Sequence, residues 1–110
     1  MSEDQDHFTR GHEFRKRGEH ALAVKAFSEA VREEPTSAAA YKGLGDSLLD
    51  LGFHKEAIAM YERGLKFAPD AEPLYNNLGA AYLAQGLGDE AEAVFRTLLE
   101  RVPTSVTAHN

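Results

Sequence analysis

Small and apolar residues recur every three or four positions along most of the chain, which is the spacing of one face of an α-helix. In the middle of the chain, Leu44 and Leu48 mark such a face, and Ala57 and Tyr61 mark the next one after a break at Gly52. No segment shows the strict alternation of a half-buried strand. The pattern therefore predicts an all-α chain of about six helices, joined in pairs as hairpins.

The same pattern returns with a fixed period of 34 residues. The series that carry it are Gly11, Gly45 and Gly79; Gly18, Gly52 and Gly86; Ala23, Ala57 and Ala91; and Pro35, Pro69 and Pro103. A unit of two helices cannot bury both of its faces alone, so successive copies stack and complete one another's core. The period predicts a single domain, residues 1–110, folded as an α-solenoid of antiparallel hairpins.

The proline series sets the expected repeat boundaries. We expect repeats at about residues 4–37, 38–71 and 72–105. Residues 106–110 have the same phase as the segment after Pro35, so they are either the truncated start of a fourth repeat or a tail. The chain is accordingly either a fragment of a longer solenoid or a solenoid that ends naturally here.

Residues with special backbone preferences predict where helices begin and end. Gly18 lies where the first helix would finish in a left-handed residue. The second helix is expected to stop just before Pro35, because proline excludes helical geometry from the residue that precedes it. Ser37 and Asp70 are expected as N-caps, and Pro73 fits the first turn of the helix after Asp70.

Glycines also fall inside the predicted helices, where glycine costs about 1 kcal/mol relative to alanine. Gly11, Gly45 and Gly79 occupy equivalent positions of this kind. Such a cost indicates close packing where two helices cross. We therefore expect Gly45→Leu to overpack the crossing and to destabilise the fold by about 1 to 3 kcal/mol.

The last two copies carry one ordered set of aromatic, leucine, glycine, alanine and proline positions. In the middle copy they are Tyr41, Leu44, Gly45, Leu48, Gly52, Ala57, Tyr61, Gly64 and Pro69, and in the third they are Tyr75, Leu78, Gly79, Tyr82, Gly86, Ala91, Phe95, Leu98 and Pro103. This set closely resembles the tetratricopeptide repeat, over about residues 4–105, and the resemblance implies that the all-α solenoid is right-handed. The first copy departs from it at His7 and Arg10, which suits a polar end repeat.

Composition and charge narrow the classes of function. The chain has 110 residues and 43% hydrophobic content, enough for one core without disulfides. Twelve Lys and Arg against eighteen Asp and Glu give a net charge of −6, which argues against a nucleic-acid or anionic-membrane partner. The chain has no cysteine and no apolar run long enough for a signal peptide or a membrane span, so a cytoplasmic location is expected.

The sequence shows no catalytic or metal-binding apparatus. The five histidines include no pair at i, i+4 spacing and no His-Glu-x-x-His. His20 and His54 recur just after the turn glycines, which is typical of a surface turn. The Gly-Leu-Gly at residues 43–45 falls inside a predicted helix and not after a strand. We therefore expect no enzyme activity, no metal and no cofactor.

The resemblance implies a concave groove lined by the first helix of each hairpin, with a protein or peptide as partner. Projection of the helical period gives the candidate peptide-binding residues Phe8, His12, Arg15, Lys16, Lys42, Asp46, Leu49, Asn76, Asn77, Ala80 and Leu83. Gly43 and Asp50 project to the same surface. Paired amides such as Asn76 and Asn77 suit an extended peptide backbone, and the alternative is that they are ordinary solvated helix residues.

One partner class can be compared directly with the sequence. Some members of the resembled family grip the acidic C-terminal tails of heat-shock chaperones with a carboxylate clamp. Lys42 and Asn77 match the clamp, but Asp46 replaces an asparagine and Thr107 replaces a lysine. Because Asp46 would repel a carboxylate, we do not expect this chain to bind such tails. The basic run at residues 15–17 either steers an acidic peptide or balances neighbouring acids.

The last hairpin is expected to leave its C-terminal face uncovered. Leu98 stands where earlier copies have Ala30 and Gly64, and we expect it to form a self-association surface with Leu99 and Val102. The function predicted from the sequence is a non-catalytic module that binds a peptide or partner helix in the groove. The alternatives are homo-oligomeric assembly through this face, or a targeting role within a larger protein.

Overall fold

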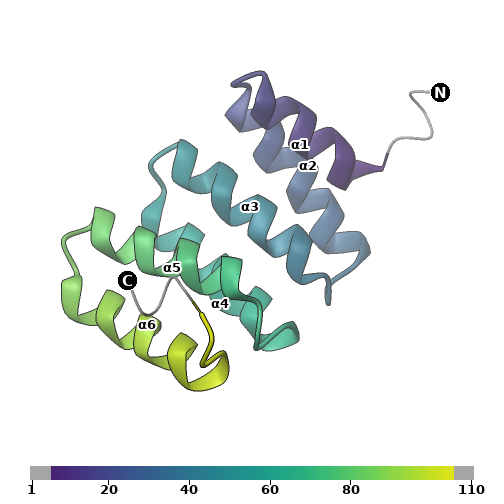
Figure 1. Ribbon diagram of the computed structural model, residues 1–110. Coiled ribbons are helices and arrows are strands. Elements are labelled where there is room, and N and C mark those ends of the chain that lie inside the picture. The colour runs from purple at the N-terminus through teal and green to yellow at the C-terminus, as the bar shows by residue number, and fades with distance from the viewer. Residues whose placement is uncertain (1–5, 106–110) are drawn as a thin grey trace.

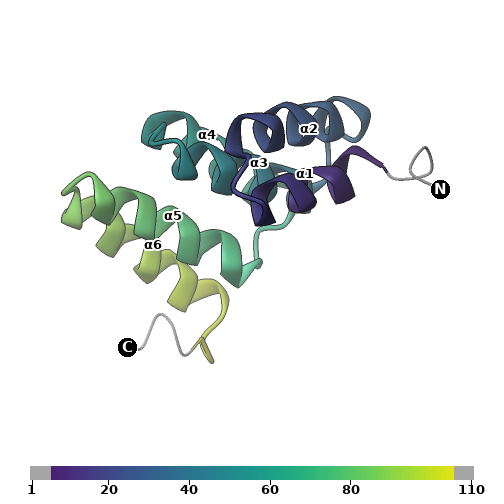
Figure 2. The ribbon, with the colours of Figure 1, turned by 90° about the horizontal axis from the view of Figure 1, so that it is seen from above.

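The computed structural model describes residues 6–105, which form six α-helices and contain no β-strand. The helices are α1 (His7–Lys16), α2 (His20–Glu33), α3 (Ala38–Asp50), α4 (His54–Phe67), α5 (Glu72–Ala84) and α6 (Gly88–Arg101). Consecutive helices pair into antiparallel hairpins that stack in chain order (Figure 1). Figure 2 shows α2 and α4 along one side of the first two hairpins and α1 and α3 along the other. The chain is therefore an all-α solenoid of helical hairpins, as the period predicts.

The turn inside each hairpin depends on a glycine. Gly18, Gly52 and Gly86 have φ values of +78°, +86° and +75°, in the left-handed region that other residues rarely adopt. The prediction for Gly18 is therefore confirmed. α2 ends at Glu33, before Pro35, also as predicted.

The two predicted N-caps have different outcomes. Ser37 caps α3, because its side-chain oxygen accepts a hydrogen bond from the Ala40 amide at 3.1 Å. The prediction for Asp70 is wrong, since the N-cap of α5 is Ala71 and its side chain makes no capping bond. Asp70 lies one residue before the N-cap, and its exposed carboxylate lies 3.4 Å from the guanidinium of Arg101.

An aromatic ring packs against each of the glycines at the three equivalent helical positions. A Cβ on Gly45 would lie 2.5 Å from Cε1 of Tyr61, and one on Gly11 would lie 2.8 Å from the ring of Phe27. In both cases the ring comes from the second helix of the same hairpin, and the third hairpin repeats the arrangement. The predicted close packing is therefore present, with a ring rather than a second backbone as the neighbour.

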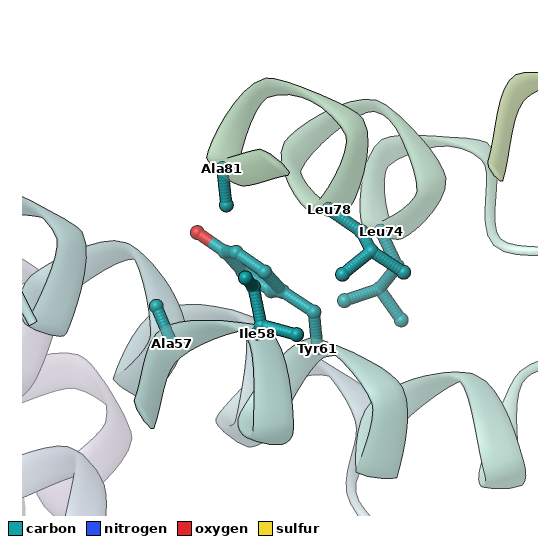
Figure 3. Close-up of a cluster of buried hydrophobic side chains, with 6 residues drawn as sticks. All are labelled: Ala57, Ile58, Tyr61, Leu74, Leu78 and Ala81. Atoms are coloured by element: carbon teal, nitrogen blue, oxygen red, sulfur yellow. The ribbon is translucent and has the colours of Figure 1, made fainter. Parts of the chain in front are cut away.

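The core lies mainly at the junctions between hairpins. At the junction of α4 and α5 the buried cluster comprises Ala57, Ile58, Tyr61, Leu74, Leu78 and Ala81 (Figure 3). At the junction of α2 and α3, Ala23, Phe27 and Leu44 form the corresponding cluster. Each hairpin thus completes the core of its neighbour, as expected for stacked repeats.

Hydrogen bonds between adjacent repeats reinforce this packing. The hydroxyl of Tyr41 donates to the carbonyl oxygen of Pro35 at 2.8 Å, and that of Tyr75 donates to the carbonyl oxygen of Pro69 at 2.6 Å. Each bond ties the first helix of a hairpin to the linker that precedes it.

Candidate functional site

The first helices of the hairpins line an open depression about 200 Å³ in volume. Four elements contribute to it, since Arg15 comes from α1, the side chains at positions 46, 49 and 50 come from α3, Tyr61 comes from α4, and Asn77 and Ala80 come from α5. Because α1, α3 and α5 contact one another in series, the depression runs across the stack. We call this surface the groove.

A buried carboxylate forms the floor of the groove. Asp46 is only 8% exposed and accepts hydrogen bonds from the Tyr61 hydroxyl at 2.5 Å, from Nδ2 of Asn77 at 2.7 Å and from Nζ of Lys42 at 3.0 Å. These donors come from α4, α5 and α3, so the carboxylate joins two hairpins. A charge buried in this way is stabilised only when its oxygens are paired, and here both are.

Tyr61 reaches this carboxylate from the core. Figure 3 shows its ring between Ile58 and Leu78, with the hydroxyl at the Ala81 end of the row. Burial, and secondarily the hydrogen bond to Asp46, raises the pKa of the Tyr61 hydroxyl far above its ordinary value. The Tyr61 hydroxyl is therefore protonated, and able to donate to Asp46, at neutral pH.

A second carboxylate links α1 to α3. Nε of Arg15 donates to Oδ2 of Asp50 at 2.6 Å, and Nη2 of Arg15 donates to Oδ1 at 3.4 Å. Nδ1 of His20 lies 3.2 Å from the same Oδ2. The hydrogen bond to Asp50 raises the pKa of Arg15. This forked contact holds the first two hairpins in register along the groove.

The N-terminal end of the groove is more basic. A second hollow of about 310 Å³ is lined by His12, Arg15, Lys16, His20 and Asp50, so it shares Arg15 and Asp50 with the first. Burial, followed by the charges of Lys42 and Arg15, lowers the pKa of His12. The groove therefore changes from basic near α1 to acidic at the carboxylates of α3.

Aromatic contacts close the α1 side of the groove. The ring of Phe8 meets those of His12 and Phe27 edge-on, with centroids 4.6 and 5.9 Å apart, and His12 meets Phe27 at 5.0 Å. Such edge-to-face contacts are favourable for aromatic pairs. Phe8 is thus largely a packing residue, half-buried against Phe27.

The structure brings together most of the residues that the helical projection selected. The predicted residues that line the two hollows are His12, Arg15, Lys16, Asp46, Leu49, Asn77 and Ala80. Lys42 lies beside them through its contact with Asp46. Asn76 and Leu83 are exposed and line neither hollow, and Phe8 lies at a separate hollow next to Ala40. Whether any of these residues binds a partner remains a prediction.

Sequence reasoning missed two contributors and misplaced one. The sequence pattern predicts only a core position for Tyr61 and a surface turn for His20, yet both line the groove. The tyrosine hydroxyl, absent from the equivalent Phe27, was the available signal. Gly43 does not face the groove: it is buried, and a Cβ there would collide with the ring of Phe27. One step of 100° from Lys42 turns it toward α2.

The C-terminal face differs from its prediction. Leu98 is 0% exposed, so the expectation that it lies on an open apolar surface is wrong. The hydroxyl of Ser105 donates to Oε2 of Glu72 at 2.6 Å, which folds the segment after α6 back onto the start of α5. Leu99 and Val102 are partly exposed, and self-association through them remains a prediction. The segment predicted to be either the start of a fourth repeat or a tail, 106–110, lies outside the described residues.

Two properties of residues 6–105 bear on other functions. No group of three or more His, Asp or Glu side chains in that range is arranged to hold a metal ion. None of its helices is long and apolar enough to cross a bilayer.

Sequence-family models give a direct match. Models of the tetratricopeptide repeat match residues 8–72 and residues 48–109. Among proteins with curated descriptions, none matches the chain.

Solved structures with the same fold include domains that carry bound peptides. The second TPR domain of human RPAP3, in complex with the HSP70 peptide SGPTIEEVD, has a TM-score of 0.85 and 19% identity, over 94% of this chain and 87% of that one. The first TPR domain of Spaghetti (RPAP3), bound to the HSP90 peptide SRMEEVD, has a TM-score of 0.80 and 19% identity, over 92% and 82% of the two chains. At this identity the likeness concerns the fold.

A more similar sequence is that of MamA. Its crystal structure has a TM-score of 0.83 and 30% identity over 86% of this chain, and the match spans 52% of the MamA chain.

Proposed function

Because the chain belongs to the tetratricopeptide-repeat family, we propose that it is a protein-interaction module that binds an extended segment of a partner protein along the groove. Folds of this kind present a long surface made from equivalent positions of successive repeats. The three hairpins place α1, α3 and α5 along one such surface.

The observation that carries this proposal is the fixed polar floor of the groove. Asp46 is held by Tyr61 and Asn77, which belong to different hairpins, so its geometry is set before any partner arrives. Asn77 donates from its amide nitrogen to Asp46, and its amide carbonyl can accept a hydrogen bond from a peptide main chain. A preformed acceptor reduces the entropy lost on binding.

The groove also indicates which peptides it disfavours. The peptides in the RPAP3 complexes end in Glu-Glu-Val-Asp. In this chain the carboxylates of Asp46 and Asp50 lie at the centre of the groove, where a C-terminal carboxylate would meet like charge. Partners with neutral or basic residues opposite α3 are therefore favoured over acidic tails.

Selection from a display library of unstructured peptides, followed by calorimetry, tests the proposal. Ala80→Arg fills the groove wall and should weaken a selected peptide about tenfold or more. The matched control is Ala59→Arg, because Ala59 is an exposed alanine on α4 that lines neither hollow, and this change should leave the affinity unchanged. Equal binding to wild type and Ala80→Arg would place the peptide elsewhere and refute the groove.

The acidic peptides provide a separate test of specificity. Titration with SRMEEVD should show no saturation of the wild-type chain at concentrations of about 100 μM. Asp46→Asn removes one like charge and should increase binding of the same peptide. Micromolar affinity of the wild-type chain for SRMEEVD would overturn the proposed preference against acidic tails. It would not contradict the proposal that the groove binds a partner.

Self-assembly through Leu99 and Val102 is the other function that the sequence predicts. Leu98 is buried and so cannot contribute to that surface, and this alternative is not favoured.

A further inference from the structure

Exposed apolar side chains gather along the edge of the solenoid that carries the hairpin turns. Leu51, Phe53 and Leu87 are 41%, 49% and 37% exposed, and Leu83, one turn before Gly86, is 56% exposed. Figure 1 shows the three intra-hairpin turns following one edge of the stack. We call the segments 51–55 and 83–89 the turn edge.

Local folding does not explain the apolar residues at two of these positions. Phe53 and Leu87 are the N-cap residues of α4 and α6, and neither makes a side-chain capping bond. An N-cap favours Ser, Thr, Asp or Asn, whose oxygen can accept from a free backbone N–H. The equivalent residue of the first hairpin is Glu19, which lies 4.0 Å from Arg17. The second and third hairpins therefore expose an aromatic or aliphatic group where a polar one would stabilise the helix.

The charges beside these residues have opposite signs. Lys55 and Asp89 occupy equivalent positions, 34 residues apart, in the first turns of α4 and α6. Both are exposed, and neither forms an ion pair with another residue in the described range. The turn edge thus has a basic end and an acidic end, each next to an apolar residue.

From this arrangement we propose that the turn edge is the contact surface of a twofold dimer of this chain. A patch with complementary halves is self-complementary under a twofold axis. In the dimer, Phe53 of one copy packs on Leu87 of the other, and Lys55 faces Asp89, twice over. Glu56 and Glu90, the next residues, point about 100° further round their helices and lie outside this pairing. No residue of the turn edge lines either hollow of the groove.

Sedimentation velocity of the full chain over a concentration series up to about 1 mM tests this directly. The wild-type chain should show a reversible monomer–dimer equilibrium. Phe53→Asp with Leu87→Asp should weaken it about tenfold or more. Each substitution also supplies a preferred N-cap, so the variant should fold at least as stably as wild type, which thermal unfolding measures.

Charge reversal identifies the pairing. Lys55→Glu and Asp89→Lys should each weaken the homodimer, and an equimolar mixture of the two variants should associate better than either alone, because both ion pairs are restored across the interface. The matched controls are Leu22→Asp, at a leucine of α2 that is 43% exposed, and Leu99→Asp, on the C-terminal face; both should dimerise normally.

Three results would overturn the proposal. A monomer at every concentration would assign the turn edge to a different protein or to none. Dimerisation unaffected by Phe53→Asp with Leu87→Asp would place the contact elsewhere, as would its loss in Leu99→Asp. Failure of the mixed variants to recover would exclude the twofold pairing.

Discussion

The first and second hairpins carry different side chains at one equivalent site, where an aromatic ring of the second helix packs on a glycine of the first. We call this site the slot. Phe27 and Tyr61 occupy equivalent positions, both side chains are 0% exposed, and each ring lies against a helical glycine of its own hairpin. The ring of His12 meets that of Phe27 edge-on, with the ring centroids 5.0 Å apart. Opposite Tyr61, at the position equivalent to His12, stands Asp46, joined to it by a hydrogen bond.

The difference is one phenolic oxygen and its acceptor. The packing of the ring on glycine is the same in both hairpins, so the fold tolerates either version. What changes is the groove wall, which is aromatic and basic at α1 and carries a buried carboxylate at α3. At the third hairpin the equivalent residue is the small Ala80. The residue pairs in this slot thus determine the chemistry of the groove, while the glycine and the ring maintain the architecture.

The largest expected effect on stability comes from filling the space that the helical glycine leaves for the ring. Gly45→Leu forces the Tyr61 ring away from α3 and should lower the free energy of unfolding by about 3 kcal/mol, measured by urea denaturation. Gly88→Ala is the matched control, because a Cβ there meets nothing within 4 Å. It should change stability by less than about 0.5 kcal/mol. A melting temperature of Gly45→Leu equal to that of wild type would refute the packing of ring on glycine.

A smaller effect should follow when the second slot is converted into the first. Tyr61→Phe removes a hydrogen bond to a charged acceptor and should cost about 1.5 kcal/mol in unfolding free energy. Adding Asp46→His creates the Phe–His pair of the first hairpin. The double variant should therefore be less destabilised than the sum of the two single variants. Strict additivity would show that the two positions are not coupled.

The mildest effect concerns alkaline pH. Burial raises the pKa of Tyr61, and also those of Tyr75 and Tyr82, above the ordinary value. The unfolded chain then loses these protons first as the pH rises past about 10, so stability is full below that pH and falls above it. Urea unfolding of wild type and Tyr61→Phe across this range should show a shallower decline in the variant. The Phe27 slot has no such group, so equal slopes would contradict the assignment to Tyr61.

Most of the fold could be predicted from the sequence, because the glycines and prolines repeat at one fixed interval. Gly18 and Gly52 need left-handed geometry, and Pro35 ends a helix, so the chain has few ways to satisfy them other than stacked hairpins. The Asp70 cap could not be predicted in this way. The Asp70 carboxylate could accept from a backbone amide or contact Arg101. Which of the two occurs depends on the tertiary distance between Asp70 and Arg101.

The candidate site could be predicted in part. Projection of one helical period finds Arg15, Asp46 and Asn77, because all three lie on first helices. It cannot find Tyr61, whose hydroxyl crosses from a second helix through the core. It also misses the burial of Leu98. Ser105 repeats Ser37 in phase, but its hydrogen bond to Glu72 depends on tertiary packing that the period does not encode.

The hydrogen bonds from Tyr41 to Pro35 and from Tyr75 to Pro69 affect how the molecule transmits force. Each linker is joined to the helix that follows it, so it cannot swing as a free hinge. A pull applied along the solenoid is resisted at both junctions by a polar bond together with the apolar core. The stack should therefore have a high stiffness along its length. Force applied to one hairpin would be transmitted to the next, and so to a partner bound by both.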